Sequence, residues 1–519
     1  DGLDLSFQAN LWQPHFVQDL GILTALQVIV EGVGLLSGAA ILVFSLAQAW
    51  LAILYWRTKN GKAPAAEIPA PWAASWPSML VQLPIYNERY VVERLLRCVA
   101  KIDYPPDKLT IQLLDDSSDE TAVIAGKVIA EIAKENGIRI EHIRRPDRRG
   151  FKAGALDYGL KICDAEFIAI FDADFLPRPD FVKRVLAYFA DPKVGMVQTR
   201  WEHLNANYSI ITRMMAFAID NHFSVEHGGR QASESFINFN GTGGMWRRKT
   251  IDDAGGWKSD TLTEDLDLSF RSQIKGWKFI FAEDITTPSE LPIQMSAVRS
   301  QQFRWTKGAA ETGRKTIVNL WHSKARLLTK VVGSFHMLNS FVFLFLLVFG
   351  LSTAALPFLG IGNFYEVAGI LNFMISAATF ATIFTYWTAQ RTGDFIGSDQ
   401  RPSSILYTTV TFMALATGLC LHCSRAVIQG LFGKTTPFVR TPKLNITAEA
   451  AQLKGKQAYT MRGIPPVALV ESAFALGFLI LAVIGFGHPA SVFTGVYLFY
   501  AIGFIVVSYL SLREILSGT

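Results

Sequence analysis

The stretch Phe167-Ile168-Ala169-Ile170-Phe171-Asp172-Ala173-Asp174 begins as an apolar, strand-like run and ends in two carboxylates at positions i and i+2. A buried strand that ends in this way brings both carboxylates to the carboxyl edge of its sheet, where open α/β sheets bind their ligands. Two oxygen ligands there suit Mg²⁺ or Mn²⁺, because proteins usually hold these ions through one or two carboxylates and the phosphates of a substrate. The alternative is a solvated turn after a strand, and the flanking sequence bears on the choice.

The sequence around this strand has the composition of an α/β domain from residue 79 to residue 310. Short apolar runs bounded by turn residues predict strands at residues 79–83, 109–114, 167–171 and 194–199. Helices are predicted between them at residues 88–101, 120–136 and 153–163. Because strands and helices alternate, we expect a Rossmann-like α/β fold with a parallel sheet covered on both faces.

The composition as a whole is too apolar for an ordinary soluble enzyme. The chain has 519 residues, enough for two or three domains, and half of them are hydrophobic. Residues 22–56 form an apolar segment longer than the ~20 residues that a span needs, so we expect one long, tilted helix. The basic residues at its end, 57–62, are expected to face the cytoplasm. Residues 64–78 are rich in proline and predict a linker.

The carboxyl-terminal half predicts four further spans, at residues 331–356, 367–387, 467–486 and 492–512. The basic residues 311–330 are typical of a cationic belt beside a membrane, and a solvated basic face is the alternative. Residues 405–432 are long enough to span, but their second half carries His422, Arg425 and Gln429. We expect that this segment lies at the interface, which gives five spans with the amino terminus outside. The expected divisions are 1–63, 64–78, 79–310, 311–330, 331–393, 404–432, 433–464 and 465–519.

Two further polar motifs end or follow predicted elements of the α/β domain. Asp115 and Asp116 end the second strand, and binding of a nucleotide base and ribose would explain them; the serines that follow are expected to cap a helix. Lys152 lies in a glycine-interrupted helix start, where it can neutralise a diphosphate or simply be solvated. Helix amino termini favour anions, which fits phosphate binding at this edge.

Two more motifs precede the membrane half. Thr263-Glu264-Asp265 stands at a helix start, where acids either complement the helix dipole or supply a general base for attack by a hydroxyl. Gln301-x-x-Arg304-Trp305 comes just before the spans. Its arginine can grip a pyrophosphate, and its indole can stack on a sugar ring or anchor the chain at the membrane interface.

Taken together, these motifs resemble those of family-two inverting glycosyltransferases with membrane channels, such as cellulose, chitin and hyaluronan synthases. The order along the chain is the same: Asp115-Asp116, Lys152-Ala153-Gly154, Asp172-Ala173-Asp174, Thr263-Glu264-Asp265 and Gln301-x-x-Arg304-Trp305. The plant cellulose-synthase-like A and C subfamilies, which make mannan or glucomannan and β-1,4-glucan backbones, resemble the chain most in Phe239-Asn240-Gly241-Thr242-Gly243. The resemblance implies a GT-A domain followed by a transmembrane domain, in a bacterial inner, plasma or Golgi-type membrane.

The resemblance also implies roles for individual residues. Donor binding is implied for Asp115, Asp116, Lys152, Asp172, Gln301 and Arg304. Asp172 and Asp174 would bind Mg²⁺ or Mn²⁺, Asp265 beside Glu264 would be the catalytic base, and the acceptor would contact Trp305, Gly241 and Thr242. Residues 436–443 are similar to the Phe-x-Val-Thr-x-Lys gating loop of bacterial cellulose synthase, which implies gating by Phe438, Val439 and Thr441, although Arg440 and Pro442 depart from the pattern.

The implied function is processive transfer of a hexose from UDP-glucose or GDP-mannose to the non-reducing end of a β-glycan, which leaves through the membrane helices. The alternative is a single transfer to a lipid, as in ceramide glucosyltransferases, and a membrane protein with an inactive transferase domain is a rival of another class. We expect membrane lipid as a partner and no nucleic acid. Because the chain ends soon after its last predicted span, we expect no cyclic-di-GMP-binding domain of the kind found in bacterial cellulose synthase.

Overall fold

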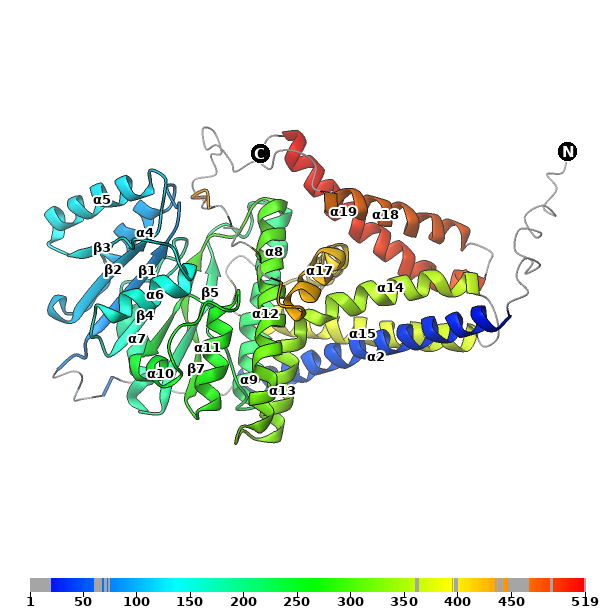
Figure 1. The fold of residues 1–519 in the computed structure, drawn as a ribbon, viewed down its shortest axis with the longest axis horizontal. Coiled ribbons are helices and arrows are strands. Elements are labelled where there is room, and N and C mark those ends of the chain that lie inside the picture. The colour runs from blue at the N-terminus through cyan, green and yellow to red at the C-terminus, as the bar shows by residue number, and fades with distance from the viewer. Residues whose placement is uncertain are drawn as a thin grey trace.

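The computed structural model describes residues 20–59, 68–69, 72, 75–359, 364–393, 395, 400–434, 436, 441, 443–446, 466–485 and 489–517. An α/β domain and a set of long apolar helices lie end to end along the long axis of the molecule (Figure 1). The amino-terminal helix α2, Leu20–Lys59, lies among the apolar helices although the chain continues from it into the α/β domain. The helices packed against it there come from the carboxyl-terminal half of the chain, between residues 342 and 392.

A single sheet of seven strands forms the centre of the α/β domain, in the order β3-β2-β1-β4-β6-β5-β7. The strands are β1 Met79–Ile85, β2 Leu109–Asp115, β3 Ile140–Ile143, β4 Phe167–Ile170, β5 Val194–His203, β6 Gly244–Arg247 and β7 Lys278–Ser289. The prediction of a parallel sheet is wrong at β6, which runs antiparallel to both of its neighbours. The amide of Gly243 bonds to the carbonyl of Ile170 at the end of β4, so a strand that starts there has to run back across the sheet.

Helices cover both faces of this sheet, as predicted. One face packs against α4 Val92–Val99, α5 Thr121–Asn136 and α7 Phe181–Leu186. The other packs against α6 Phe151–Lys161, α8 Ile210–Asn221, α10 Arg248–Asp253 and α11 Glu264–Ile274. Successive residues of a strand point to opposite faces, so Phe167 enters the first core and Ile168 the second. All four residues of β4 are buried, which makes its end a fixed base for Asp172 and Asp174.

Two helical runs lie between the sheet and the apolar helices. The first continues from α8 through a π-helical turn, η3 His222–Glu226, into α9 His227–Ala232. The second is α12, Met295–His322, which has 28 residues. The helix α12 passes without a break through residues 310 and 311, between which the sequence analysis expects a division. Of the basic residues at 311–330, Arg314 and Lys315 therefore belong to a helix that begins inside the α/β domain, whereas Lys324 and Arg326 follow the end of that helix.

Among the residues that the structure describes, five helices are long and apolar enough to cross a membrane: Leu23–Lys59, Leu327–Leu359, Phe364–Thr392, Pro466–Ile484 and Ser491–Leu516. They consist of α2, α13 Leu327–Leu338 with α14 Val342–Leu359, α15 Phe364–Thr392, α18 Pro466–Ile484 and α19 Thr494–Ser517. The segment expected at the interface is not one helix. It consists of α16 Pro402–Gly418 and α17 Cys420–Leu431, which are bent by 54° relative to each other and are long and apolar enough to span a membrane only when taken together. These helices are consistent with a transmembrane domain.

Side chains from the apolar helices hold the α/β domain in place. Arg299 of α12 forms a bidentate ion pair with Glu471 of α18, at 2.8 Å for Nη1, and both side chains are buried. Buried charges of this kind are stable only when paired and hydrogen-bonded.

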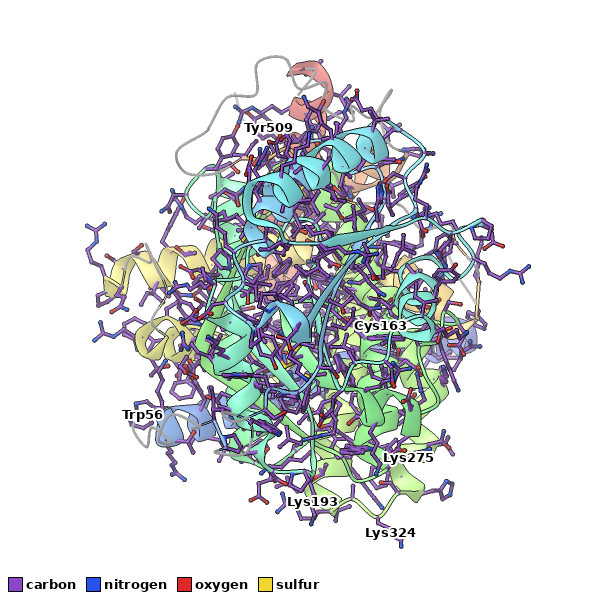
Figure 2. The ribbon with its side chains drawn as sticks, turned by 90° about the vertical axis from the view of Figure 1, so that its left-hand side faces the viewer. Trp56, Cys163, Lys193, Lys275, Lys324 and Tyr509 are labelled. Carbon is purple, nitrogen blue, oxygen red and sulfur yellow. The ribbon has the colours of Figure 1, made fainter. Side chains whose placement is uncertain are left out.

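Near the carboxyl end of α2, Trp56 is 58% exposed and lies at the edge of the molecule when it is viewed from the α/β end (Figure 2). That position suits an indole at a membrane surface.

Candidate active site

A cavity of about 430 Å³ lies at the carboxyl edge of the sheet. Its walls come from the ends of β1, β2 and β4, the start of α6, the turn at 240–241, the loop 259–263, the start of α11, the helix α12 and the residues Thr436, Thr441 and Lys443. Most of these segments are far apart in the sequence, and the sheet brings them to one edge because parallel strands all end there. The cavity is the natural place for a ligand of this domain.

The acids after β4 meet a lysine on the floor of the cavity. Nζ of Lys152, in the first turn of α6, lies 2.5 Å from Oδ1 of Asp172 and donates to the carbonyl of Gly241 at 2.9 Å. The amide of Asp172 donates to Oγ1 of Thr242 at 2.9 Å. Burial opposes the charged form of Lys152, but Asp172, Glu264 and Asp265 raise its pKa above the ordinary value. The lysine is therefore a lasting positive charge beside the acids.

The second acid, Asp174, is paired with a residue from the far end of the chain. Its Oδ2 accepts a short hydrogen bond from Nζ of Lys443, which also donates to the carbonyl of Glu290 at 3.1 Å. The carboxylate of Glu290 in turn accepts from the amide of Leu444 and pairs with Arg94 at 3.0 Å. A lysine from the segment after α17 thus lies directly on the predicted metal ligand.

The carboxylates of Asp172 and Asp174 suit a divalent cation whose remaining ligands come from a substrate. Within the described residues, no cluster of three or more His, Cys, Asp or Glu side chains can hold a metal by itself. Mg²⁺ and Mn²⁺ sites commonly use one or two carboxylates together with phosphate oxygens. Both carboxylates are balanced here by lysine ammonium groups, so this is a place where positive charge is required.

The first turn of α11 carries the two acids of the Thr-Glu-Asp motif on the opposite wall. Burial raises the pKa of Asp265 to about 7, and the neighbouring Glu264 adds to this effect. Burial also raises the pKa of Glu264. The amide of Leu266 donates to Oδ1 of Asp265 at 2.8 Å, which fixes one oxygen and leaves the other toward the cavity. A carboxylate with a pKa near neutrality is well matched to accept a proton at physiological pH.

The helix α12 contributes the third wall, with Gln301, Arg304 and Trp305 all lining the cavity. Nη2 of Arg304 donates to Oγ1 of Thr441 at 2.9 Å, so the segment after α17 covers this guanidinium too. Burial lowers the pKa of Arg304 to about 10, which leaves it charged at neutral pH. An arginine in this position can bind a diphosphate with two parallel hydrogen bonds.

The region after β2 differs from the one that the motif predicted. Asp116 lines the cavity and is paired with Arg145, whose Nε lies 2.9 Å from Oδ1. Asp115 lies outside the residues that line the cavity. Its side chain is fully buried and bonds to Nε2 of His142 and the amide of Ser117, each at 2.8 Å. Its carboxylate is therefore used within the fold.

Residues 77–308 match the family model described as Glycosyltransferase like family 2. The α/β domain is a family 2 glycosyltransferase domain. Over 276 residues the chain is 40% identical to the Arabidopsis thaliana protein named "Probable glucomannan 4-beta-mannosyltransferase 15", a match that covers 52% of this chain and 50% of the relative. It is 38% identical over 276 residues to glucomannan 4-beta-mannosyltransferase 7 of Arabidopsis thaliana, with 52% and 49% covered. The chain thus spans about half the length of the curated relatives it matches.

The fold of the glycosyltransferase domain has a solved counterpart. A mannosyltransferase from Pyrobaculum calidifontis, solved with GDP-Man and Mn²⁺, superposes with a TM-score of 0.54 and 20% sequence identity. The match covers 78% of this chain and all of the other. The likeness identifies the domain as a GT-A fold, in agreement with the prediction.

Most of the predicted site residues of the glycosyltransferase domain meet in the one cavity. Those that line it are Asp116, Lys152, Asp172, Asp174, Gly241, Glu264, Asp265, Gln301, Arg304, Trp305 and Thr441. Thr242 and Asp115 are buried and are not among the residues that line it. Phe438 and Val439 lie outside the described residues, so their predicted gating role stays a prediction.

Several cavity residues were not predicted. The guanidinium carbon of Arg148 lies 3.3 Å from the ring centre of Tyr86, and both side chains line the cavity near Asp116. Trp201 and Lys307 line it as well. The arginines at residues 144–149 could have predicted a binding role for this region, because arginines near the end of a strand are frequent where phosphates or aromatic bases bind.

Proposed function

We propose that the chain is a membrane-embedded, inverting hexosyltransferase that adds a hexose from a nucleotide sugar to a growing β-glycan. One observation carries this proposal: a carboxyl group with a pKa of about 7, Asp265, faces the same cavity as the Lys152–Asp172 pair. A proton acceptor and a diphosphate site then lie on two sides of one small space. The names of the relatives, which are mannosyltransferases, support transfer of a hexose.

The reaction proposed for this cavity needs one proton acceptor and several positive groups. Asp265 accepts the proton of the acceptor hydroxyl while that oxygen bonds to the anomeric carbon of the donor sugar. The bond between this carbon and the diphosphate oxygen breaks, the configuration inverts, and negative charge develops on the diphosphate. Lys152 and Arg304 face that charge, and preorganised cations at such a point give a large part of a catalytic effect.

Asp172 and Asp174 are proposed to hold Mg²⁺ or Mn²⁺ together with the donor. When bound, the ion supplies further positive charge to the departing diphosphate. Lys443 has to leave Asp174 for this to happen, because its ammonium group lies on the same carboxylate. The neighbour from Pyrobaculum calidifontis, described in complex with GDP-Man and Mn²⁺, supports the choice of a divalent cation.

GDP-mannose is the donor that we propose first, with UDP-glucose second. The relatives named as glucomannan 4-beta-mannosyltransferases and the neighbour solved with GDP-Man both favour mannose. Arg148 stacked on Tyr86 beside Asp116 offers an aromatic and charged place for the nucleoside. The growing glycan is the proposed acceptor, and Trp305 and Gly241 are its proposed contacts.

The proposed topology places the glycosyltransferase domain in the cytoplasm. The basic end of α2 and the basic residues of α12 lie on the side of this domain, as the positive-inside bias requires. Five helices cross the membrane, and the bent pair α16–α17 stays at the interface, so that residues 433–464 remain on the cytoplasmic side with Lys443. Residues 1–63, 331–393 and 465–519 then form the membrane domain around a domain at 79–310.

The proposal is tested with the full chain in lipid nanodiscs, given labelled GDP-mannose or UDP-glucose and Mn²⁺. The expected product is a polymer whose length grows with time. Trp305→Ala should shorten it while donor binding persists, because a stacked sugar holds the growing end between additions. A product of one hexose on a lipid would contradict processivity, and a wild-type chain that transfers no hexose would contradict the proposal as a whole.

A further inference from the structure

The π-helical turn η3 places an unusual group of polar side chains beneath the cavity. π-helical turns are rare and occur often at functional sites. His222 and Glu226 come from this turn, and His227 follows it as a fully buried residue at the start of α9. None of these residues takes part in the proposed chemistry. Their hydrogen bonds nevertheless lead to the cavity.

The amide of Asn240 lies between the two histidines. Nε2 of His227 is 2.8 Å from Oδ1 of Asn240, and Nδ2 of Asn240 is 2.8 Å from Nε2 of His222. An amide NH₂ group only donates, so Nε2 of His222 accepts and its proton lies on Nδ1. That proton is directed at Oε2 of Glu226, which lies 2.8 Å from Nδ1 of His222. The three bonds therefore have one consistent direction, from His227 to Glu226.

The opposite orientation of this amide is unfavourable. It would require His227 to accept at Nε2 and to carry its proton on Nδ1, a buried atom that has no hydrogen-bond partner among the described residues. A buried donor without a partner destabilises the folded state, because it has lost its hydrogen bond to water. Burial lowers the pKa of His227 well below its ordinary value, with His222 and Arg230 adding to the effect. The neutral ring is thus held in the tautomer that donates to Asn240.

The residues next to Asn240 hold the reaction groups. The carbonyl of Gly241 accepts from Lys152 at 2.9 Å, and Oγ1 of Thr242 accepts from the amide of Asp172 at 2.9 Å. Gly241 has φ of +82°, and a Cβ on it would lie 3.0 Å from Oδ2 of Asp265. Glycine adopts this left-handed conformation without strain but is free to adopt many others, so contacts with neighbouring residues are needed to hold the turn in place. The amide of Asn240 provides such a contact.

The other end of this set of hydrogen bonds is the amino-terminal helix. Nε2 of Gln48, in α2, donates to Oε1 of Glu226 at 3.3 Å. Two glycines bring α9 directly onto α2: a Cβ on Gly228 would lie 2.4 Å from Cδ2 of Tyr55, and one on Gly229 would lie 2.6 Å from the carbonyl of Leu51. The carboxyl end of α2 accordingly lies against α9 at the junction of the two halves (Figure 1).

We propose that α2 positions the reaction site through the series Gln48–Glu226–His222–Asn240. In this view Gln48 and His222 are positioning residues for the turn at 240–242, and the first membrane helix contributes to turnover as well as to anchoring. The inference rests on the proposed function and extends it to residues that touch neither donor nor acceptor. Its chemical requirement at residue 222 is one acceptor directed at Asn240 and one donor directed at Glu226.

That requirement allows a direct test with the full chain in nanodiscs. His222→Leu provides neither group, whereas His222→Gln provides both through its carbonyl and its NH₂. Turnover of hexose transfer, donor affinity and the unfolding temperature are measured for each. His222→Leu should lower kcat roughly 10–100-fold, the range expected when reacting groups are slightly misplaced, with little change in donor affinity. His222→Gln should regain most of that loss, which a merely structural role does not predict.

The role of α2 has a matched control in the same helix. Gln48→Leu should lower kcat several-fold, whereas Gln27→Leu, which removes a bond to Glu31 of the same helix, should leave it unchanged. The double variant Gln48→Leu with His222→Leu should lose no more than His222→Leu alone, because coupled residues do not add. If His222→Leu does not fold, the comparison of Gln48→Leu with Gln27→Leu decides.

Three results would overturn the inference: additive losses, equal kcat for Gln48→Leu and Gln27→Leu, or His222→Gln as impaired as His222→Leu. Each of these leaves an active wild-type chain, so the proposed function would stand. A wild-type chain that transfers no hexose would instead overturn the proposed function, and the inference with it.

Discussion

Acids stand at two places along the same edge of the sheet, and their environments differ. Asp115, at the end of β2, is fully buried against His142 and the amide of Ser117; burial works to raise its pKa, but these hydrogen bonds outweigh it and the pKa is lowered. Burial instead raises the pKa of Asp172, after β4, and that of Asp265, at the start of α11. The first acid is already satisfied by the fold, whereas the others face the cavity. The same residue type is therefore used within the fold in one place and, under the proposed function, takes part in the reaction in the other.

The largest effect should come from Asp265→Asn. An amide is isosteric with the acid but does not accept the proton of an acceptor hydroxyl, so turnover should fall by about 10²–10⁴-fold. Donor affinity should change little, because the lysine and arginine that face the diphosphate remain. Initial rates with labelled donor, together with donor titration by calorimetry, measure the two quantities separately. Turnover close to that of the wild type would remove Asp265 from the base role.

The next largest effect should come from Asp174→Asn. Loss of one of two metal carboxylates should weaken Mn²⁺-dependent donor binding and lower activity roughly 10²-fold. The Mn²⁺ concentration needed for half-maximal rate, measured for wild type and variant, reports this directly. Addition of EDTA to the wild type is the control and should abolish transfer. Full activity in EDTA would show that these carboxylates do not act through a metal.

The pH dependence of transfer should show the raised pKa of the cavity acid. A base works only when deprotonated, so kcat should fall about tenfold for each pH unit below about 7 and level off above it. Rates measured from about pH 5 to about pH 9 at saturating donor test this. The variant Glu264→Gln should move the inflection to lower pH, because the negative charge of Glu264 raises the pKa of Asp265. An unshifted inflection would assign the titration to another group.

Much of the glycosyltransferase site could be predicted because its residues lie at element ends. Asp172 and Asp174 follow an unmistakable strand, and Asp265 stands at a helix start, so the sheet edge brings them together. The contact of Asp174 with Lys443 could not be predicted. The two residues are 269 positions apart, and hydrophobic periodicity predicts local elements but not which distant loop packs against the sheet. The π-helical turn at His222 could not be predicted either. It differs from an α-helix in its backbone hydrogen bonds, which join residues i and i+5, and no residue pattern in the sequence marks that change.

The sheet itself shows the same limit. The four predicted strands are confirmed as β1, β2, β4 and β5, because they are apolar runs that are buried on both faces. β3 and β6 have four residues, as β4 does, but they include polar or charged residues or glycine instead of a continuous apolar run, and β7 is polar in its second half. The missed strand β6 is also the one that makes the sheet mixed. Whether β6 pairs parallel or antiparallel with β4 depends on the turn before β6, at Gly243, rather than on the residues of β6 itself.

The smallest effect on activity should come from Asp115→Asn, although Asp115 belongs to the Asp-Asp pair. The variant loses charged hydrogen bonds to His142 and Ser117, so the free energy of unfolding should fall by about 1–3 kcal/mol while kcat changes less than tenfold. The folded-state pKa of Asp115 is lowered, so its stabilising contribution is present above about pH 3.9 and is lost as the pH falls through the folded value. The stability difference between wild type and variant should therefore shrink in acid. Chemical denaturation at several pH values measures it, and a loss of turnover as large as that of Asp265→Asn, in a chain of normal stability, would show that both acid groups serve chemistry.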